Sequence, residues 1–340
     1  MAKYAYIAAT EFFLPKAQLT NQDLAAEFSE WGVDKIFQKT GIATRHIAAK
    51  NECASDLAIL AAQRLFESSG VSPSAIDYIV YCTQSPDYFL PATACVIQDR
   101  LGISVDCGAI DINQGCSGFV YSIGLAKALI ESRQAENVLV LTAETYSKFI
   151  NPRDKSVRTL FGDAAAATLV ASCENSRPLL HSFHYGTDGS GAPNLIVPVG
   201  GARRPLGTES RIEREDESGN FRSDADLYMN GPEIFAFTLK SVPHLVSQVL
   251  ARSGLNIEDV DYFVPHQANK FMLDAIVKRT GFADAKTIRA YESCGNTVSC
   301  TIPIALASAL SEEKLKPGNK LLLAGFGVGY SWAGCIVEWR

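Results

Sequence analysis

The sequence predicts an α/β protein built from two similar halves. Short apolar runs of strand length alternate with longer segments of helical period. Residues 69–80 align without a gap to residues 253–264, and both copies lead into a helical segment that ends in Arg-x-Gly. A short strand and a turn that pairs cysteine with glycine then follow in each copy. A repeat that preserves the order of its flanking elements is best explained by duplication.

The elements of the first half follow from periodicity and from helix-ending glycines. Glycine follows three helical segments, at Gly41, Gly70 and Gly102, and it is the residue that most readily adopts the left-handed conformation that ends a helix. We expect strands at residues 4–8, 76–81, 109–112, 137–142 and 164–171, and helices at residues 20–41, 54–69, 93–101 and 119–130.

The second half contains the least regular part of the chain. Residues 185–231 are rich in glycine and proline and are predicted to form a solvated loop or flap. A long helix should follow over residues 233–253, with Pro243 as a kink or a boundary. The junction of the halves, at residues 173–178, divides the chain into domains 1–175 and 176–340.

Composition excludes several classes of protein. The 340 residues are 47% hydrophobic and 20% charged, which is typical of a globular protein with room for two domains. A net charge of -6 argues against a nucleic-acid binder. The nine cysteines include no CxxC pair and no zinc-type cluster with histidine, so we expect no metal and a reducing compartment. With no leader and no membrane span expected, the predicted location is the cytoplasm.

Cys116 is the candidate nucleophile. It lies in a turn between a predicted strand and a predicted helix, with Gly115 before it and Gly118 two residues after it. The amides and the dipole at a helix N-terminus favour a thiolate, the form in which cysteine attacks. The alternative is an inert buried cysteine, which is common in proteins.

His266 and Asn296 are the candidate partners of Cys116. His266 follows the repeated strand, and Asn296 lies in the turn that corresponds to the turn of Cys116. All three positions therefore fall at the carboxyl ends of strands, where α/β sheets carry their sites. Each residue alone would more often be structural, but their coincidence in duplicated positions predicts an active site.

The order Cys, His, Asn also describes papain-like proteases. That reading lacks support here, because the sequence has no Cys-Gly-Ser-Cys-Trp motif, no leader and no disulfide framework. Duplication has no role in such a protease.

The motifs together resemble β-ketoacyl-acyl-carrier-protein synthase III, of the thiolase superfamily. The likeness covers nearly the whole chain, and it implies a duplicated, five-layered αβαβα thiolase fold and a homodimer. It also implies decarboxylative Claisen condensation of an acyl thioester with malonyl-acyl-carrier protein, in fatty acid or related acyl-chain biosynthesis. The motifs are Gly115–Phe119, Phe161–Asp163, Pro265–Asn269, Gly295–Thr297 with Ile302-Pro303, and Gly325–Gly334.

The resemblance assigns roles to the candidate residues. Cys116 would carry the acyl group, and His266 with Asn296 would donate hydrogen bonds to the enolate left by decarboxylation. The backbone N–H groups of Cys116 and Val328 would hold the second oxyanion, although the family usually has glycine at position 328.

Further assignments concern the substrate and the partners. Leu90, Phe161 and Phe326 are expected to line the substrate pocket, with Leu90 reaching across the dimer. Docking of the acidic carrier protein is assigned to the basic residues Lys270, Lys278 and Arg279, whose alternative reading is a solvated helix face. No cofactor is expected beyond the acyl-coenzyme A or acyl-carrier-protein thioesters used as substrates.

Two departures from the family pattern suggest an accessory member with a different acyl donor. The tryptophan and arginine that sandwich the adenine of coenzyme A in housekeeping members are Lys35 and Lys155 here, with Trp31 and Arg158 nearby. Pro232 replaces an asparagine near the pantetheine tunnel. Such members act in secondary-metabolite or surface-glycolipid assembly, and some transfer an acyl group without condensation.

Other members of the superfamily remain as alternatives. A thiolase would need a second cysteine as base and a hydroxymethylglutaryl synthase a glutamate, whereas Cys294 does not match the thiolase position. An inactive partner of another ketosynthase would be expected to lose part of the Cys-His-Asn set, which is intact here.

Overall fold

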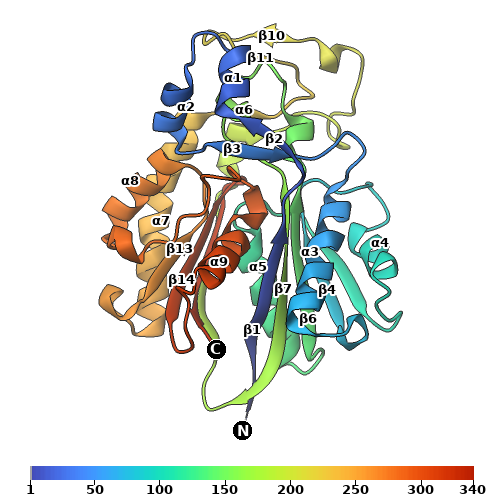
Figure 1. The fold of residues 1–340 in the computed structure, drawn as a ribbon, viewed down its shortest axis with the longest axis vertical. Coiled ribbons are helices and arrows are strands. Elements are labelled where there is room, and N and C mark those ends of the chain that lie inside the picture. Colours follow the sequence, from blue (N-terminus) through green and yellow to red (C-terminus); the bar gives the residue numbers. More distant parts are fainter. Residues whose placement is uncertain (1) are drawn as a thin grey trace.

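Two mixed β-sheets form the frame of the computed structural model, which describes residues 2–340 (Figure 1). The first sheet has the strand order β1-β7-β6-β4-β5 and the second the order β13-β14-β15-β8. The strands of the first sheet are β1 (Ala2–Phe13), β4 (Tyr78–Cys82), β5 (Gly108–Ile112), β6 (Asn137–Glu144) and β7 (Ala164–Asn175). Those of the second are β8 (Leu180–Thr187), β13 (Tyr262–Pro265), β14 (Lys320–Gly327) and β15 (Ser331–Glu338).

The two sheets share one topology. β1 and β8 pair antiparallel to β7 and β15, which pair antiparallel to β6 and β14. β6 and β14 then pair parallel to β4 and β13. In the second sheet, Thr287 forms an isolated parallel bridge with Phe263 of β13. It thus lies beside β13 as β5 lies beside β4 in the first sheet. This correspondence supports the predicted duplication, and the predicted division after residue 175 falls in the connection between β7 and β8.

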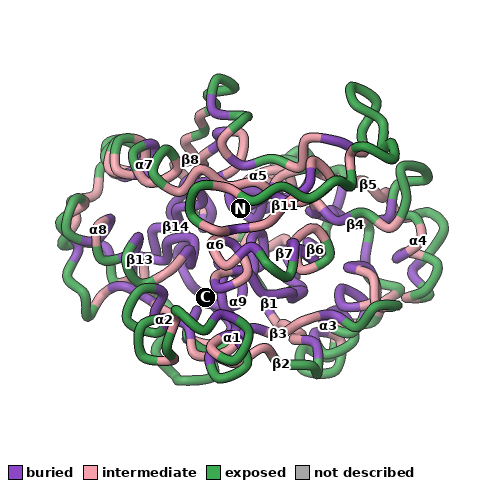
Figure 2. Tube along the Cα trace, turned by 90° about the horizontal axis from the view of Figure 1, so that it is seen from above, coloured by how far each residue is buried: buried purple, intermediate pink, exposed green. Residues whose placement is uncertain are grey.

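Helices form three layers, one on the outer face of each sheet and one between the two sheets. α3 (Ala54–Ser69) and α4 (Thr93–Arg100) cover the outer face of the first sheet, and α7 (Gly231–Ser253) and α8 (Lys270–Thr280) cover the outer face of the second. α5 (Gly118–Glu131) and α9 (Thr301–Ser311) lie between the sheets and pack against both. This is the five-layered αβαβα arrangement predicted from the sequence, with the buried segments in the middle of the molecule (Figure 2).

Insertions form a cap above the sheets (Figure 1). The predicted helix at residues 20–41 is two helices, because the chain turns at residues 28–32 and Gly32 caps the second. The predicted loop at residues 185–231 contains four short strands. The cap elements are α1 (Asn21–Glu27), α2 (Val33–Thr40), α6 (Lys155–Arg158), β2 (Ala17–Thr20), β3 (Thr44–Ile47), β9 (Leu195–Ile196), β10 (Arg214–Glu215), β11 (Phe221–Arg222) and β12 (Tyr228–Met229).

The helix α7 continues through Pro243 without a boundary. Within residues 2–340 it is the one helix long and apolar enough to cross a membrane by length and composition. In this fold, however, its apolar face packs on β8, β14 and β15, as expected of a core helix.

A buried carboxyl group joins the two halves beneath the cap. Glu144, at the end of β6, is fully buried and accepts hydrogen bonds from Ser299 Oγ at 2.8 Å, Ser85 Oγ at 3.1 Å and the Gln84 N–H at 3.1 Å. Ser299 belongs to the second half, in the turn before α9. Loss of solvation on burial raises the pKa of Glu144 to about 8, so the carboxyl is mostly protonated at neutral pH.

We expect Glu144 to make stability fall as pH rises. Because the native pKa lies above the ordinary value of 4.5, the native state retains a proton that the unfolded state has lost between those two pH values. The stabilisation is complete below pH 4.5 and is lost as pH approaches 8. The free energy of unfolding of the parent, minus that of Glu144→Gln, should fall by up to about 1.4 kcal/mol per pH unit in this window. Urea unfolding of both proteins at three pH values measures it, and parallel pH profiles would contradict it.

Candidate active site

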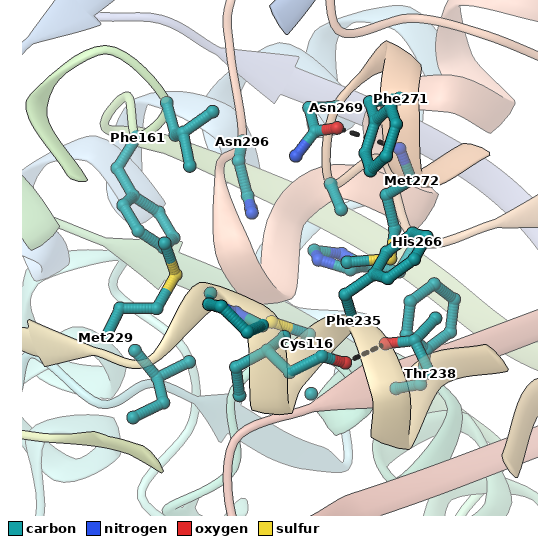
Figure 3. A pocket seen from close by; sticks show the side chains of 18 residues that line it. Cys116, Phe161, Met229, Phe235, Thr238, His266, Asn269, Phe271, Met272 and Asn296 are labelled. Atoms are coloured by element: carbon teal, nitrogen blue, oxygen red, sulfur yellow. Dashed lines mark hydrogen bonds between the residues drawn. The ribbon is translucent and has the colours of Figure 1, made fainter. Parts of the chain in front are cut away.

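One cavity of about 500 Å³ brings together the residues of the predicted active site (Figure 3). Cys116, His266 and Asn296 all line it, and so do Phe161 and Phe326. The rest of the wall is largely apolar and comes from the start of α7 and α8 and from the cap. An apolar cavity with a few converging polar groups is typical of a small-molecule site.

Glycines let the backbone pack closely around Cys116. The residue lies between the end of β5 and the start of α5, in a turn closed by a 2.8 Å hydrogen bond from the Gly118 N–H to the Gly115 carbonyl. A Cβ atom on Gly327 would stand 2.7 Å from Cys116 Sγ, and one on Gly115 would stand 2.6 Å from Val328 Cγ1. Side chains at these two positions would therefore displace the sulfur or its surroundings.

The thiol of Cys116 is more strongly desolvated than the sequence suggests. Burial raises its pKa to about 12, and the nearby Glu144 carboxyl adds to the rise. The backbone N–H groups of Val328 and Cys116 act on the sulfur in the opposite direction but do not offset the burial. The expected thiolate is therefore wrong for the protein without substrate, in which Cys116 is a neutral thiol at neutral pH. The same two N–H groups are the predicted oxyanion donors.

Asn296 is held by a contact between the two halves. Its N–H donates to the Leu160 carbonyl at 2.9 Å, and its carbonyl accepts from the Gly162 N–H at 3.0 Å. A Cβ atom on Gly162 would stand 2.3 Å from the Cys294 carbonyl oxygen, so this approach requires glycine.

The side chain of Asn296 has a fixed orientation. Its Oδ1 accepts a 2.9 Å hydrogen bond from the Val298 N–H. Val298 reaches this position with a φ of +55°, which is strained for a β-branched residue. With Oδ1 engaged, the Nδ2 group points into the cavity as a hydrogen-bond donor (Figure 3).

His266 follows β13 and is 2% exposed. Burial lowers its pKa to about 3, so the imidazole is neutral at neutral pH. The ring meets Phe326 edge-to-face, with 5.4 Å between centroids. Its Nδ1 lies 2.7 Å from Thr301 Oγ1 at the start of α9. The imidazole is thus fixed in place and carries one proton on one of its two nitrogens.

The other predicted residues have different surroundings. Leu90 is 82% exposed and does not line the cavity of its own chain. It can therefore line a substrate pocket only in a second subunit. Lys278 and Arg279 are exposed at the end of α8. Lys270, at its start, forms a 2.5 Å ion pair with Asp274.

Some residues at the site carry no recognisable signal in the sequence. At the cavity, Phe235 and Phe271 stack with 5.0 Å between centroids, and Phe271 is 63% exposed. Tyr146 belongs to the same apolar cluster as Cys116, and its hydroxyl donates to Gln84 Oε1 at 2.5 Å. These contacts depend on segments that are distant in the sequence.

Known proteins share both the sequence and the fold of this chain. Family models described as 3-oxoacyl-[acyl-carrier-protein] synthase III and its C-terminal part match residues 110–189 and 250–339. β-Ketoacyl-[acyl-carrier-protein] synthase III of Caldanaerobacter subterraneus subsp. tengcongensis is 36% identical over 98% of this chain and 98% of its own. The protein of the same name from Xanthomonas oryzae pv. oryzae is 36% identical over 99% and 98%.

Solved structures agree with these relatives. A 2.1 Å crystal structure of a 3-oxoacyl-(acyl-carrier-protein) synthase III is 50% identical, with a TM-score of 0.98 over 99% of this chain and 100% of its own. The 3-oxoacyl-(acyl-carrier protein) synthase from Burkholderia xenovorans LB400 is 34% identical, with a TM-score of 0.90 over 99% and 95%. The chain therefore belongs to the β-ketoacyl-acyl-carrier-protein synthase III family of the thiolase superfamily.

Proposed function

We propose that Cys116, His266 and Asn296 carry out the reaction of this family, the condensation of an acyl thioester with malonyl-acyl-carrier protein in fatty acid biosynthesis. The observation that carries the proposal is the convergence of these three side chains, from both halves of the chain, in one apolar cavity. The product is a β-ketoacyl thioester, formed through an acyl group on Cys116.

The first step transfers the acyl group. Cys116 Sγ attacks the thioester carbonyl, and the new oxyanion accepts hydrogen bonds from the N–H groups of Cys116 and Val328. These N–H groups already act on the sulfur in the protein without substrate. The tetrahedral intermediate collapses with loss of the donor thiolate, which takes up the proton that Cys116 gives up. The charge on sulfur needs to develop only during the attack, which agrees with the raised pKa of the resting thiol.

The second step uses the two donors on the opposite wall. The malonyl thioester loses carbon dioxide, and its carbonyl becomes an enolate oxygen that accepts hydrogen bonds from His266 Nε2 and Asn296 Nδ2. The carbanion attacks the acyl carbonyl on Cys116, and the sulfur leaves as a thiolate that takes up a proton from solvent to restore the thiol. A neutral His266 suits this role, because it donates a hydrogen bond without first taking up a proton.

Acylation should occur on Cys116 alone. Mass spectrometry of the intact protein and its peptides, after incubation with a panel of acyl donors, should show one adduct on Cys116 and identify the preferred acyl group. Cys116→Ala should show none, while replacement of the exposed Cys95 should leave the adduct unchanged. An adduct on another of the nine cysteines, with product still formed by Cys116→Ala, would remove Cys116 as nucleophile.

His266→Ala and Asn296→Ala should separate the two steps. Each variant should still form the adduct on Cys116, while release of carbon dioxide from malonyl-acyl-carrier protein should fall at least about a hundredfold, the usual cost of one oxyanion donor. Single-turnover assays measure the two steps independently. Release of carbon dioxide at the parent rate by either variant would contradict the enolate assignment.

We further propose an acyl-carrier-protein donor, because the candidate adenine site is occupied by side chains of this chain. The ammonium groups of Lys35 and Lys39 lie 5.5 and 4.8 Å from the centroid of the Trp31 ring. Lys155 pairs with Glu30 at 2.5 Å and Arg158 with Glu27 at 2.8 Å. An ammonium does not reproduce the planar stacking of an arginine, so the nucleotide should contribute little to binding.

An acyl-carrier-protein donor should therefore acylate Cys116 faster than the matching acyl-coenzyme A. The advantage should shrink at high salt, because exposed charges are screened. Lys278→Glu with Arg279→Glu should lower the rate with the carrier protein by about tenfold and leave the rate with coenzyme A unchanged. Lys316→Glu, before the start of β14, is the matched control. Equal or faster acylation by coenzyme A would mean that Trp31 and Arg158 rebuild the adenine site.

The proposal includes a homodimer in the cytoplasm. Tyr88, Phe89 and Leu90 form a run of apolar side chains that are 61%, 90% and 82% exposed. Burial of this loop in a second subunit would remove apolar surface from water, and would place Leu90 where the resemblance puts it, at the acyl pocket of the partner. The second candidate function is that of an accessory member that uses a non-acetyl acyl group. The departures from the family pattern at Lys35 and Lys155 support it.

A further inference from the structure

Thr301 contacts a residue of the candidate active site without lining the cavity itself. It is the first residue of α9, it is 2% exposed, and it does not line the cavity. Its Oγ1 lies 2.7 Å from His266 Nδ1 and is the only side-chain hydrogen-bond partner of that nitrogen within residues 2–340. Thr301 therefore acts on a substrate only through His266.

The hydroxyl of Thr301 has one proton and two possible acceptors. One is His266 Nδ1, and the other is the Val298 carbonyl oxygen at 3.1 Å. If the hydroxyl donates to Nδ1, the single proton of the neutral imidazole has to be on Nε2. If it donates to Val298, Nδ1 carries the proton and donates to the hydroxyl, and Nε2 is left as a lone pair.

We propose that Thr301 is a positioning residue that donates to His266 Nδ1 and thereby holds the imidazole as its Nε2–H tautomer. This rests on the proposed function, in which Nε2 donates to the enolate oxygen. Both contacts of the hydroxyl lie within hydrogen-bond distance, and the donor role of Nε2 selects the arrangement in which the hydroxyl donates to Nδ1. Asn296 provides a parallel, since the Val298 N–H fixes its amide with Nδ2 in the cavity. The turn before α9 and the first residue of α9 thus orient the two donors, one through a backbone N–H and one through a hydroxyl.

The kinetic test compares Thr301→Val with Thr301→Ser. Valine has nearly the shape of threonine but has no hydroxyl, whereas serine retains it. We expect Thr301→Val to lower the rate of decarboxylation by about ten- to a hundredfold, as the loss of a group that orients another does elsewhere. Acylation of Cys116 should change little, because it uses backbone donors. Thr301→Ser should retain most of the parent rate of decarboxylation.

The spectroscopic test reads the tautomer directly. The two nitrogens of a neutral imidazole have distinct ¹⁵N chemical shifts, so protein labelled with ¹⁵N-histidine reports which one is protonated. The signal of His266 among the five histidines is assigned by its loss in His266→Ala. The parent and Thr301→Ser should show Nε2–H, and Thr301→Val should show a mixture or Nδ1–H.

The outcomes separate this inference from the proposed function. Nδ1–H in the parent, decarboxylation at the parent rate by Thr301→Val, or loss of activity in Thr301→Ser to the level of Thr301→Val would each overturn the inference. If one of these results is found but His266→Ala is inactive in decarboxylation, the inference about Thr301 fails and the assignment of His266 to the enolate still stands. Absence of any adduct on Cys116 in the parent would instead overturn the proposed function itself.

Discussion

The candidate active site depends on a close backbone contact between the two halves. The strand-like contact between Phe161 and Asn296 brings the turn before α9 against the chain that precedes β7. It is possible because Gly162 and Gly295 have no side chains, and a Cβ atom on Gly295 would stand 2.8 Å from the Leu160 carbonyl oxygen. The buried Arg45 supports the same contact, since its Nε donates to the Thr159 carbonyl at 2.9 Å. Without this contact, Asn296 would not face Cys116 across one cavity.

Burial determines the protonation states of the ionisable groups at and near this site. Desolvation keeps Cys116 as a thiol, His266 as a neutral imidazole and Glu144 largely as a neutral carboxyl. A site of neutral donors has little charge to offer a ground-state thioester. Such a site suits the proposed oxyanion and enolate, whose charges appear only during the two steps, because hydrogen bonds to such charges are strongest in an apolar, dry cavity.

Sequence reasoning predicted what depends on local patterns. The repeat at residues 69–80 and 253–264 implied the shared topology, and the glycines beside Cys116 implied the turn that the structure contains. Cys116 and His266 follow the ends of β5 and β13 as predicted, whereas Asn296 follows no strand and is placed by its isolated bridge to Phe161.

What sequence reasoning missed depends on packing between distant segments. The expected thiolate at Cys116 was wrong because the sequence shows the helix terminus but not the depth of burial. The break between α1 and α2 was missed because apolar spacing continues across residues 28–32. The contacts of Thr301 with His266 and of Tyr146 with Gln84 join residues far apart in the chain, and hydroxyl-bearing residues carry no periodic signal.

Duplication accounts for the two facing turns that supply donors in the proposed two-step reaction. Each half supplies a turn that leads into a central helix, with Cys116 before α5 and Asn296 before α9. In the proposed mechanism, the acyl oxygen accepts from the N–H of Cys116 in the first turn and from that of Val328 after β14, whereas the malonyl oxygen accepts from the Asn296 amide, which the second turn fixes through the Val298 N–H. His266 adds the second donor from the end of β13, the strand that corresponds to β4 of the first half. In the proposed mechanism, the second half therefore supplies both donors to the enolate and shares the donors to the acyl oxyanion with the first half, and the carbanion formed on one wall faces the acyl group held on the other.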